Sequence, residues 1–124
     1  MARSAKYTML FFRTNSGRCE VKTFLHKMEA GCRDKCMSYL KRIRMEGVEH
    51  VPTNYAKKLV DNLYEARPEW NNVEYRFLFG YVTADAYGVV MALKKNVQRL
   101  RPRDLNTAAD RINKMAKTMK ESNI

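Results

Sequence analysis

The sequence predicts an α+β fold: a small antiparallel sheet with an N-terminal helical hairpin and a C-terminal helix, in the order β-α-α-β-β-β-α. Residues 59–95 have strand character, and the stretches before and after them show apolar residues at helical spacing. A chain of 124 residues is long enough for one hydrophobic core and too short for two. We therefore expect a single domain over residues 1–124, with the helices on one face of the sheet.

The N-terminal part is expected to hold one strand and two helices. Residues 7–12, YTMLFF, are predicted to form the strand, because the turn-rich sequence RTNSGR follows this aromatic stretch. The spacing of apolar residues predicts a helix over 21–28 and, after an Ala-Gly break, a second helix over 32–45. Gly47 is suited to end the second helix, and a loop to about residue 55 follows.

Three strands are expected in the central part, over 62–68, 73–82 and 87–95. The first two are separated by Asn71-Asn72, which we read as a two-residue turn because asparagine tolerates the positive φ that such turns require.

The C-terminal segment, residues 102–122, is predicted to be a helix that begins near Asp104 or Asn106. Basic residues lie towards its C-terminal end, where they suit the helix dipole. Its apolar stripe consists of Leu105, Ala108, Ala109, Ile112, Met115, Ala116 and Met119.

The charge balance predicts a polyanionic partner. The chain has 24 Lys and Arg against 13 Asp and Glu, a formal net charge of +11, which favours nucleic acid, an anionic membrane surface or an acidic protein. No apolar run is long enough for a membrane span, and the apolar patch after the basic start is too short for a signal peptide. Three cysteines, an odd number, do not suggest a disulfide framework, so we expect a cytoplasmic protein with reduced thiols.

The Asn71-Asn72 turn predicts a charged face on the sheet. With this turn, position i pairs with position 143 − i, so Arg67 faces Arg76. The same face carries Leu63, Glu65 and Leu78, and the opposite face carries Tyr64, Ala66, Tyr75, Phe77 and Phe79. Two like charges facing each other are destabilising. Either a phosphate lies between them, or Glu65 pairs diagonally with Arg76, Arg67 points to solvent, and the face has no further role.

Further basic residues are expected to surround this face, which would let it hold a phosphodiester. They are Lys57, Lys58, Lys94, Lys95, Arg99, Arg101 and Arg103. Cleavage of RNA without a metal needs a base for the 2′-hydroxyl, charge stabilisation, and an acid for the 5′-oxygen. Glu65 is a candidate base, and one of the four lysines is the competing choice. His50, Tyr81 and Tyr87 are candidate acids, although a lone loop histidine is more often a bystander and the tyrosines suit packing.

Two further features have both a structural and a functional interpretation. Cys32 and Cys36, with Cys19 and His26 nearby, have a spacing that zinc sites permit. They also fall on the apolar face of a predicted helix, so we expect core thiols and no metal. Trp70 beside the turn could stack on a base or cover the end of the core.

Three segments together resemble RelE/HigB-type toxins, especially the phage-derived HigB-like branch of the RelE/ParE superfamily: AKKLVDNLYEAR, EYRFLF and ALKKNVQRLRP. The stretch NSGRCEVKTFLHKM and the helix ending at MEGV are similar to that branch as well. The resemblance implies the toxin of a type II toxin–antitoxin pair, a ribosome-dependent mRNA endonuclease without a cofactor. Its partners would be mRNA on the ribosome and an antitoxin, often one with a helix-turn-helix.

By match of position, the resemblance places six residues at the RNA: Lys57 or Lys58, Glu65, Arg67, Arg76, Lys94 and Lys95. The chain departs from several members in lacking a His or Tyr just after the last strand, where Lys94-Lys95-Asn96 stands instead. Two alternatives therefore stay open beside the nuclease. One is a non-catalytic basic module or a gyrase inhibitor of the same fold, and the other is a protein whose basic surface binds only an acidic partner.

Overall fold

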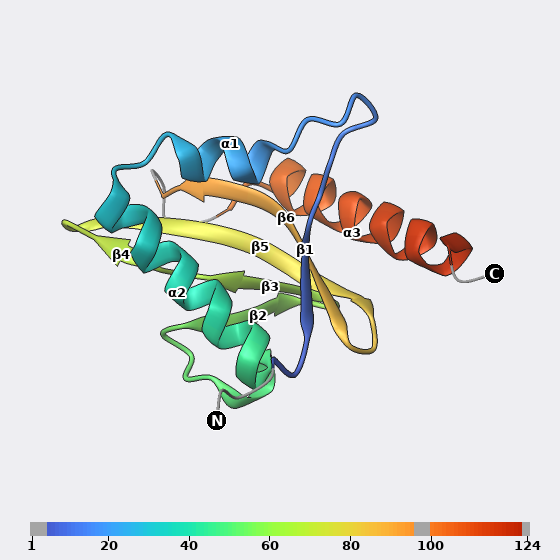
Figure 1. The fold of residues 1–124 in the computed structure, drawn as a ribbon, viewed down its shortest axis with the longest axis horizontal. Coiled ribbons are helices and arrows are strands. Elements are labelled where there is room, and N and C mark those ends of the chain that lie inside the picture. Colours follow the sequence, from blue (N-terminus) through green and yellow to red (C-terminus); the bar gives the residue numbers. More distant parts are fainter. Residues whose placement is uncertain (1–4, 96–99, 123–124) are drawn as a thin grey trace.

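The computed structural model describes residues 5–95 and 100–122, and it confirms an α+β fold (Figure 1). Its elements are β1 (Thr8–Phe11), α1 (Glu20–His26), α2 (Ala30–Glu46), the 3-10 helix η1 (Val48–His50), β2 (Ala56–Val60), β3 (Leu63–Ala66), β4 (Glu69–Trp70), β5 (Val73–Thr83), β6 (Ala86–Lys94) and α3 (Pro102–Ser122). Across these residues, we find no helix with both the length and the apolar character that crossing a bilayer requires.

The sheet differs from the expected one in the direction of its first strand. The strand order is β1-β6-β5-β3-β2, with β4 paired to β5 off this path. Each neighbouring pair is antiparallel except β1–β6, which is parallel. A hairpin forces two strands to be antiparallel, but β1 and β6 are separated by two α-helices, the 3-10 helix η1 and four strands, so no turn constrains their direction.

The expectation that the helices share one face of the sheet was wrong. Helices α1 and α2 cover one face, and α3 packs on the other (Figure 1). Both faces of β5 are apolar along its middle: Phe77 and Phe79 enter the core beneath α1 and α2, while Leu78 and Val82 enter the core beneath α3. A strand that is apolar on both faces needs a layer on each side.

Helix α3 approaches the sheet closely because two glycines lie beneath it. A Cβ atom on Gly80 would collide with the carbonyl oxygen of Asn62 and lie 2.7 Å from Ile112 Cδ1. One on Gly88 would lie 2.7 Å from the sulfur of Met115. The predicted apolar stripe forms this contact, with Ala108 and Ile112 buried, although Ala109 is exposed.

Strand β2 was not predicted, and the expected strand 62–68 is divided. Two consecutive lysines, Lys57 and Lys58, interrupt the apolar alternation that would have indicated a strand in β2. Charged residues are common on edge strands such as this one. Strand β3 ends at Ala66 and β4 begins at Glu69, because Pro68 has no N–H to donate to a ladder.

Candidate nucleic-acid site

The pairing of β3 with β5 follows the predicted register. Glu65 pairs with Leu78, Ala66 with Phe77 and Trp70 with Val73, all as position i with position 143 − i. The residues Asn71 and Asn72 both have positive φ, 50° and 65°, as a tight two-residue turn requires. The Tyr75 N–H donates to the Pro68 carbonyl (2.9 Å) and keeps this register through the gap between β3 and β4. Arg67 and Arg76 therefore lie across from each other, as the sequence predicted.

Glu65 lies between the two arginines and compensates their repulsion. One carboxylate oxygen is 3.6 Å from Arg67 Nε, and the other is 3.7 Å from Arg76 Nε. The side chains of Glu65 and Arg76 are 2% and 8% exposed, while that of Arg67 is 30% exposed. The sequence left open that Glu65 pairs with Arg76 while Arg67 points to solvent, and the first part of this alternative is confirmed. Arg67, however, is held in ion pairs and does not simply point into solvent.

A second carboxylate, Glu74, completes the group and was missed in the sequence. Arg67 Nε donates to Glu74 Oε1 (3.1 Å), and Lys95 Nζ donates to Glu74 Oε2 (3.4 Å). Burial by itself raises the pKa of Glu74, but the hydrogen bond from Arg67 and the charges of Arg67 and Lys95 outweigh it and lower the pKa. Alternation along β5 could have revealed this residue, because Glu74 is two positions from Arg76 and shares its face. We call Glu65, Arg67, Glu74, Arg76 and Lys95 the Glu65 cluster.

Each predicted lysine pair is divided between the two faces of the sheet. Lys57 pairs with Glu65 in register, so its exposed side chain shares the face of the cluster, whereas Lys58 pairs with Tyr64 and belongs to the other face. Lys95 joins the cluster, whereas Lys94 pairs with Tyr75. The structure therefore does not bring Lys58 or Lys94 to the cluster.

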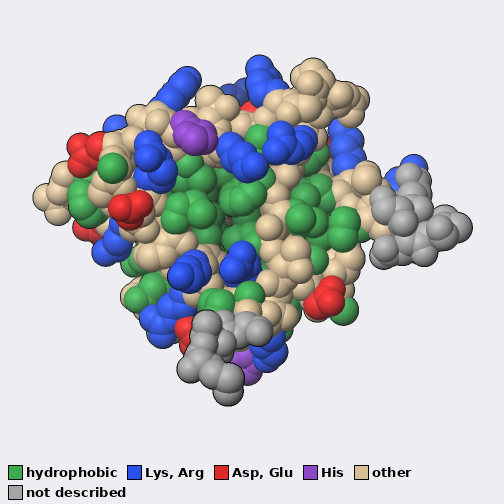
Figure 2. All heavy atoms as spheres, viewed as in Figure 1, with side chains coloured by type: hydrophobic (Ala, Val, Ile, Leu, Met, Phe, Trp, Pro, Cys, Tyr) green, Lys and Arg blue, Asp and Glu red, His purple; other side chains and the backbone are tan. Residues whose placement is uncertain are grey.

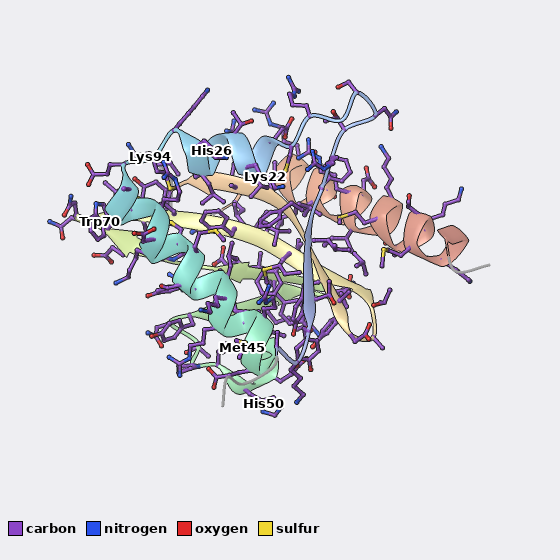
Figure 3. The ribbon with its side chains drawn as sticks, in the orientation of Figure 1. Lys22, His26, Met45, His50, Trp70 and Lys94 are labelled. Carbon is purple, nitrogen blue, oxygen red and sulfur yellow. The ribbon has the colours of Figure 1, made fainter. Side chains whose placement is uncertain are left out.

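The remaining predicted RNA-binding residues are Trp70, Arg101 and Arg99. Trp70 belongs to β4, and its side chain lies on the face of the sheet that α1 and α2 cover, next to the start of α2 (Figure 3). There its Nε1 donates to Oε1 of Glu29 (2.9 Å). Arg101 precedes α3, is exposed, and pairs with Asp104 at 3.6 Å. Arg99 falls outside the described residues.

The candidate acids do not meet the Glu65 cluster. Tyr81 and Tyr87 pack beneath α1 and α2, on the opposite face of the sheet. The hydroxyl of Tyr87 donates to that of Tyr81 (3.0 Å), which in turn donates to Glu49 (2.8 Å). Burial, followed by these hydrogen bonds, raises the pKa of Tyr81, so it is a poor proton donor. His50 is exposed in η1.

The cysteines are core thiols, as predicted. Cys32 and Cys36 are buried, and both thiols contact the sulfur of Met28, at 3.7 and 3.9 Å. Burial, with contributions from Cys32, raises the pKa of Cys36 to about 12. Among residues 5–95 and 100–122, no three His, Cys, Asp or Glu side chains are arranged to hold a metal ion.

A comparison with protein families gives a match over most of the chain. The family described as Phage derived protein Gp49-like (DUF891) matches residues 23–113. This region runs from α1 into α3 and includes the whole Glu65 cluster. The family is toxin-like, of the toxin–antitoxin kind that includes RelE/HigB-like proteins, which agrees with the resemblance seen in the sequence. No curated protein matches the chain.

Proposed function

Because this chain belongs to the phage-derived Gp49-like family, we propose that it is the toxin of a type II toxin–antitoxin pair and that it cleaves mRNA on the ribosome. The observation that carries the proposal is the Glu65 cluster: two facing guanidiniums oriented by one carboxylate, with the exposed Lys57 beside them. The net charge of +11 supports a polyanionic substrate.

The proposed reaction is an attack of the ribose 2′-oxygen on the adjacent phosphorus. The 2′-hydroxyl loses its proton to a base, a bond forms between the 2′-oxygen and phosphorus, and the bond to the 5′-oxygen breaks. The 5′-oxygen takes a proton from an acid, so the products are a 2′,3′-cyclic phosphate and a 5′-hydroxyl. Guanidiniums stabilise the additional negative charge on the phosphate oxygens in the transition state.

Arg67 is the arginine we place on the phosphate. Its side chain is 30% exposed, whereas that of Arg76 is only 8% exposed. Glu65 is too deeply buried to reach a ribose hydroxyl, and both of its oxygens lie against guanidiniums. We therefore assign Glu65 a positioning role, with Arg76 as the second guanidinium that it orients, in place of the base suggested by the sequence.

Two lysines are left for the proton transfers. Lys57 is exposed beside Glu65, so we place its amine against the 2′-hydroxyl. Lys95 lies on the other side of the cluster, held by Glu74 at 3.4 Å, and we place its ammonium against the leaving 5′-oxygen. These groups supply acid, base and charge stabilisation from the chain itself, which is why the proposed reaction uses no metal.

The test is induction of the gene in cells, followed by primer extension on abundant messages. We expect cuts that depend on translation, and Arg67→Ala should reduce them by about 10²-fold or more, the usual cost of removing one group that stabilises transition-state charge. Arg44→Ala is the matched control, because Arg44 is an exposed arginine on α2 and should leave cutting unchanged. Full cutting by Arg67→Ala would remove this arginine from the mechanism.

The variant Glu65→Gln distinguishes two roles for Glu65, orienting the arginines or acting as the general base. If Glu65 only orients the arginines, the variant keeps reduced cutting with an unchanged pH dependence, whereas Lys57→Ala removes the limb of the pH–rate profile on which the rate rises with pH. If Glu65 is the base, Glu65→Gln removes that limb instead.

We also propose an antitoxin as the second partner, one with a helix-turn-helix. Co-expression with the neighbouring open reading frame should restore growth, and the two proteins should purify as one complex. Growth arrest that persists with every neighbouring frame would contradict this pairing.

One observation favours a non-catalytic alternative. In the Glu65 cluster, each carboxylate is already ion-paired with two cations, as a purely structural network would be. The chain would then be a basic nucleic-acid-binding module or a gyrase inhibitor of the same fold. Growth arrest with intact RNA and altered DNA supercoiling would favour this reading over the nuclease.

A further inference from the structure

A cavity of about 470 Å³ lies on the face of the sheet opposite the Glu65 cluster. It is formed where the junction of α1 and α2 meets β4 and the ends of β5 and β6, and the proposed reaction does not use it. Six of its lining residues matter here: Phe24, Lys27, Glu29, Trp70, Tyr75 and Lys94. We call it the Trp70 cavity. It contains Trp70 and Lys94, two of the predicted site residues that do not reach the cluster.

We infer that the Trp70 cavity binds one nucleotide of an RNA strand, with the base against its aromatic rings and the phosphate between Lys27 and Lys94. Its volume falls within the range of pockets that hold small organic ligands. The inference rests on the proposed function only in taking RNA as the source of the nucleotide.

The rings form a rigid apolar wall suited to a nucleobase. The indole of Trp70 is half-buried and is fixed by its bond to Glu29, and a Cβ atom on Gly31 would lie 2.7 Å from it. Phe24 and Tyr75 meet edge to face, with ring centroids 6.2 Å apart. Single-stranded RNA is held mainly by bases that stack on such side chains, and a fixed ring loses little entropy on binding.

The charges at the rim match a phosphate. Lys27 and Lys94 are both exposed and both line the cavity. Glu29 is the single carboxylate among the six residues named, and one of its oxygens already accepts the Trp70 hydrogen bond. Figure 2 shows apolar side chains on this face with Lys and Arg around much of their edge, and with Asp and Glu at the end where Figure 3 labels Trp70. Figure 3 shows Lys94 and Trp70 at the same end of the sheet.

The cavity and the cluster lie back to back across the same strands. Tyr75 belongs to the cavity, while its neighbours Glu74 and Arg76 belong to the cluster. Lys94 and Lys95 are divided in the same way, and consecutive Cα atoms are only about 3.8 Å apart. One RNA strand that passes around this end of the sheet would therefore contact both sites.

Trp70 is the only tryptophan in the chain, so its fluorescence reports on the cavity directly. The purified full chain is titrated with adenosine 5′-monophosphate, a six-nucleotide oligoadenylate and inorganic phosphate. We expect saturable quenching by the nucleotide and by the oligonucleotide, tighter for the latter, and none by phosphate. A phosphate response equal to that of the nucleotide, or no saturable quenching by either RNA ligand, would overturn the inference. Equal affinity for nucleotide and oligonucleotide would overturn its assignment to RNA.

Lysine variants test the site itself. Lys94→Ala and Lys27→Ala should each weaken nucleotide binding by about fivefold or more, as expected for loss of one charge-assisted contact. Lys35→Ala is the matched control, since Lys35 is exposed on α2 and lies outside the cavity. An equal loss in the control would show non-specific attraction and refute the site.

The same measurements separate this inference from the proposed nuclease. Quenching with no cutting in cells would leave the cavity assignment standing and refute the nuclease. Cutting in cells with no change in Trp70 fluorescence would support the nuclease and refute the cavity assignment.

Discussion

Replacing Glu65 by glutamine should destabilise the fold strongly, because it leaves the two arginines facing each other. Each ion pair spans 3.6–3.7 Å, which corresponds to about 4–5 kcal/mol of attraction at an effective dielectric constant of about 20. Much of this is offset by the cost of burying the carboxylate, and Arg67 is partly screened by solvent. Breaking a buried pair from one side typically costs about 3–5 kcal/mol, and we expect the lower end, about 3 kcal/mol.

The assays are urea unfolding and thermal unfolding, each followed by Trp70 fluorescence and far-UV circular dichroism. For a chain of this length, a loss of about 3 kcal/mol lowers the melting temperature by roughly 10 °C. Glu74→Gln is the matched control: the Glu74 side chain is 23% exposed, so its pairs with Arg67 and Lys95 should contribute about 1 kcal/mol or less.

A double-mutant cycle tests why Glu65→Gln loses stability. If the loss comes from an uncompensated buried charge, Arg76→Met in the Glu65→Gln background should cost much less than it does in the wild type. Equal losses for Glu65→Gln and Glu74→Gln, or additive effects in the cycle, would refute the reasoning that burial makes Glu65 the central charge.

Three further predictions follow from the structure. Because the pKa of Glu74 is lowered on folding, its contribution is complete above the ordinary carboxyl value of 4.5 and is lost as the pH falls through the lower folded value. The difference in unfolding free energy between wild type and Glu74→Gln should therefore shrink in acid; a constant difference from pH 3 to 7 would contradict the lowered pKa. Gly80→Ala should cost more than about 2 kcal/mol in urea unfolding, since the methyl group would meet the Asn62 carbonyl and α3, whereas Ala84→Gly in the exposed turn should cost little. At pH 8 the native Cys36 thiol should resist iodoacetamide, because it is buried and its pKa is about 12, while the urea-unfolded protein should react readily; rapid labelling of the native protein would show that α2 opens.

Local chemistry made much of the fold predictable. Helices expected over 21–28, 32–45 and 102–122 are found at Glu20–His26, Ala30–Glu46 and Pro102–Ser122, because apolar spacing reports directly on a helical face. The β3–β5 register followed from Asn71-Asn72, because a tight turn with positive φ determines every pair behind it. The facing of Arg67 and Arg76 is a consequence of that turn alone.

The sequence by itself thus determined the helices, the central hairpin and the charged face of the sheet, but not strand β2 or the division between β3 and β4. Only the tertiary structure decided the parallel pairing of β1 and the packing of α3 on the face that carries Glu65. Both depend on contacts between segments far apart in the chain, which no local pattern encodes. The structure also decided the surroundings of Glu65: its side chain is 2% exposed and pairs with both Arg67 and Arg76.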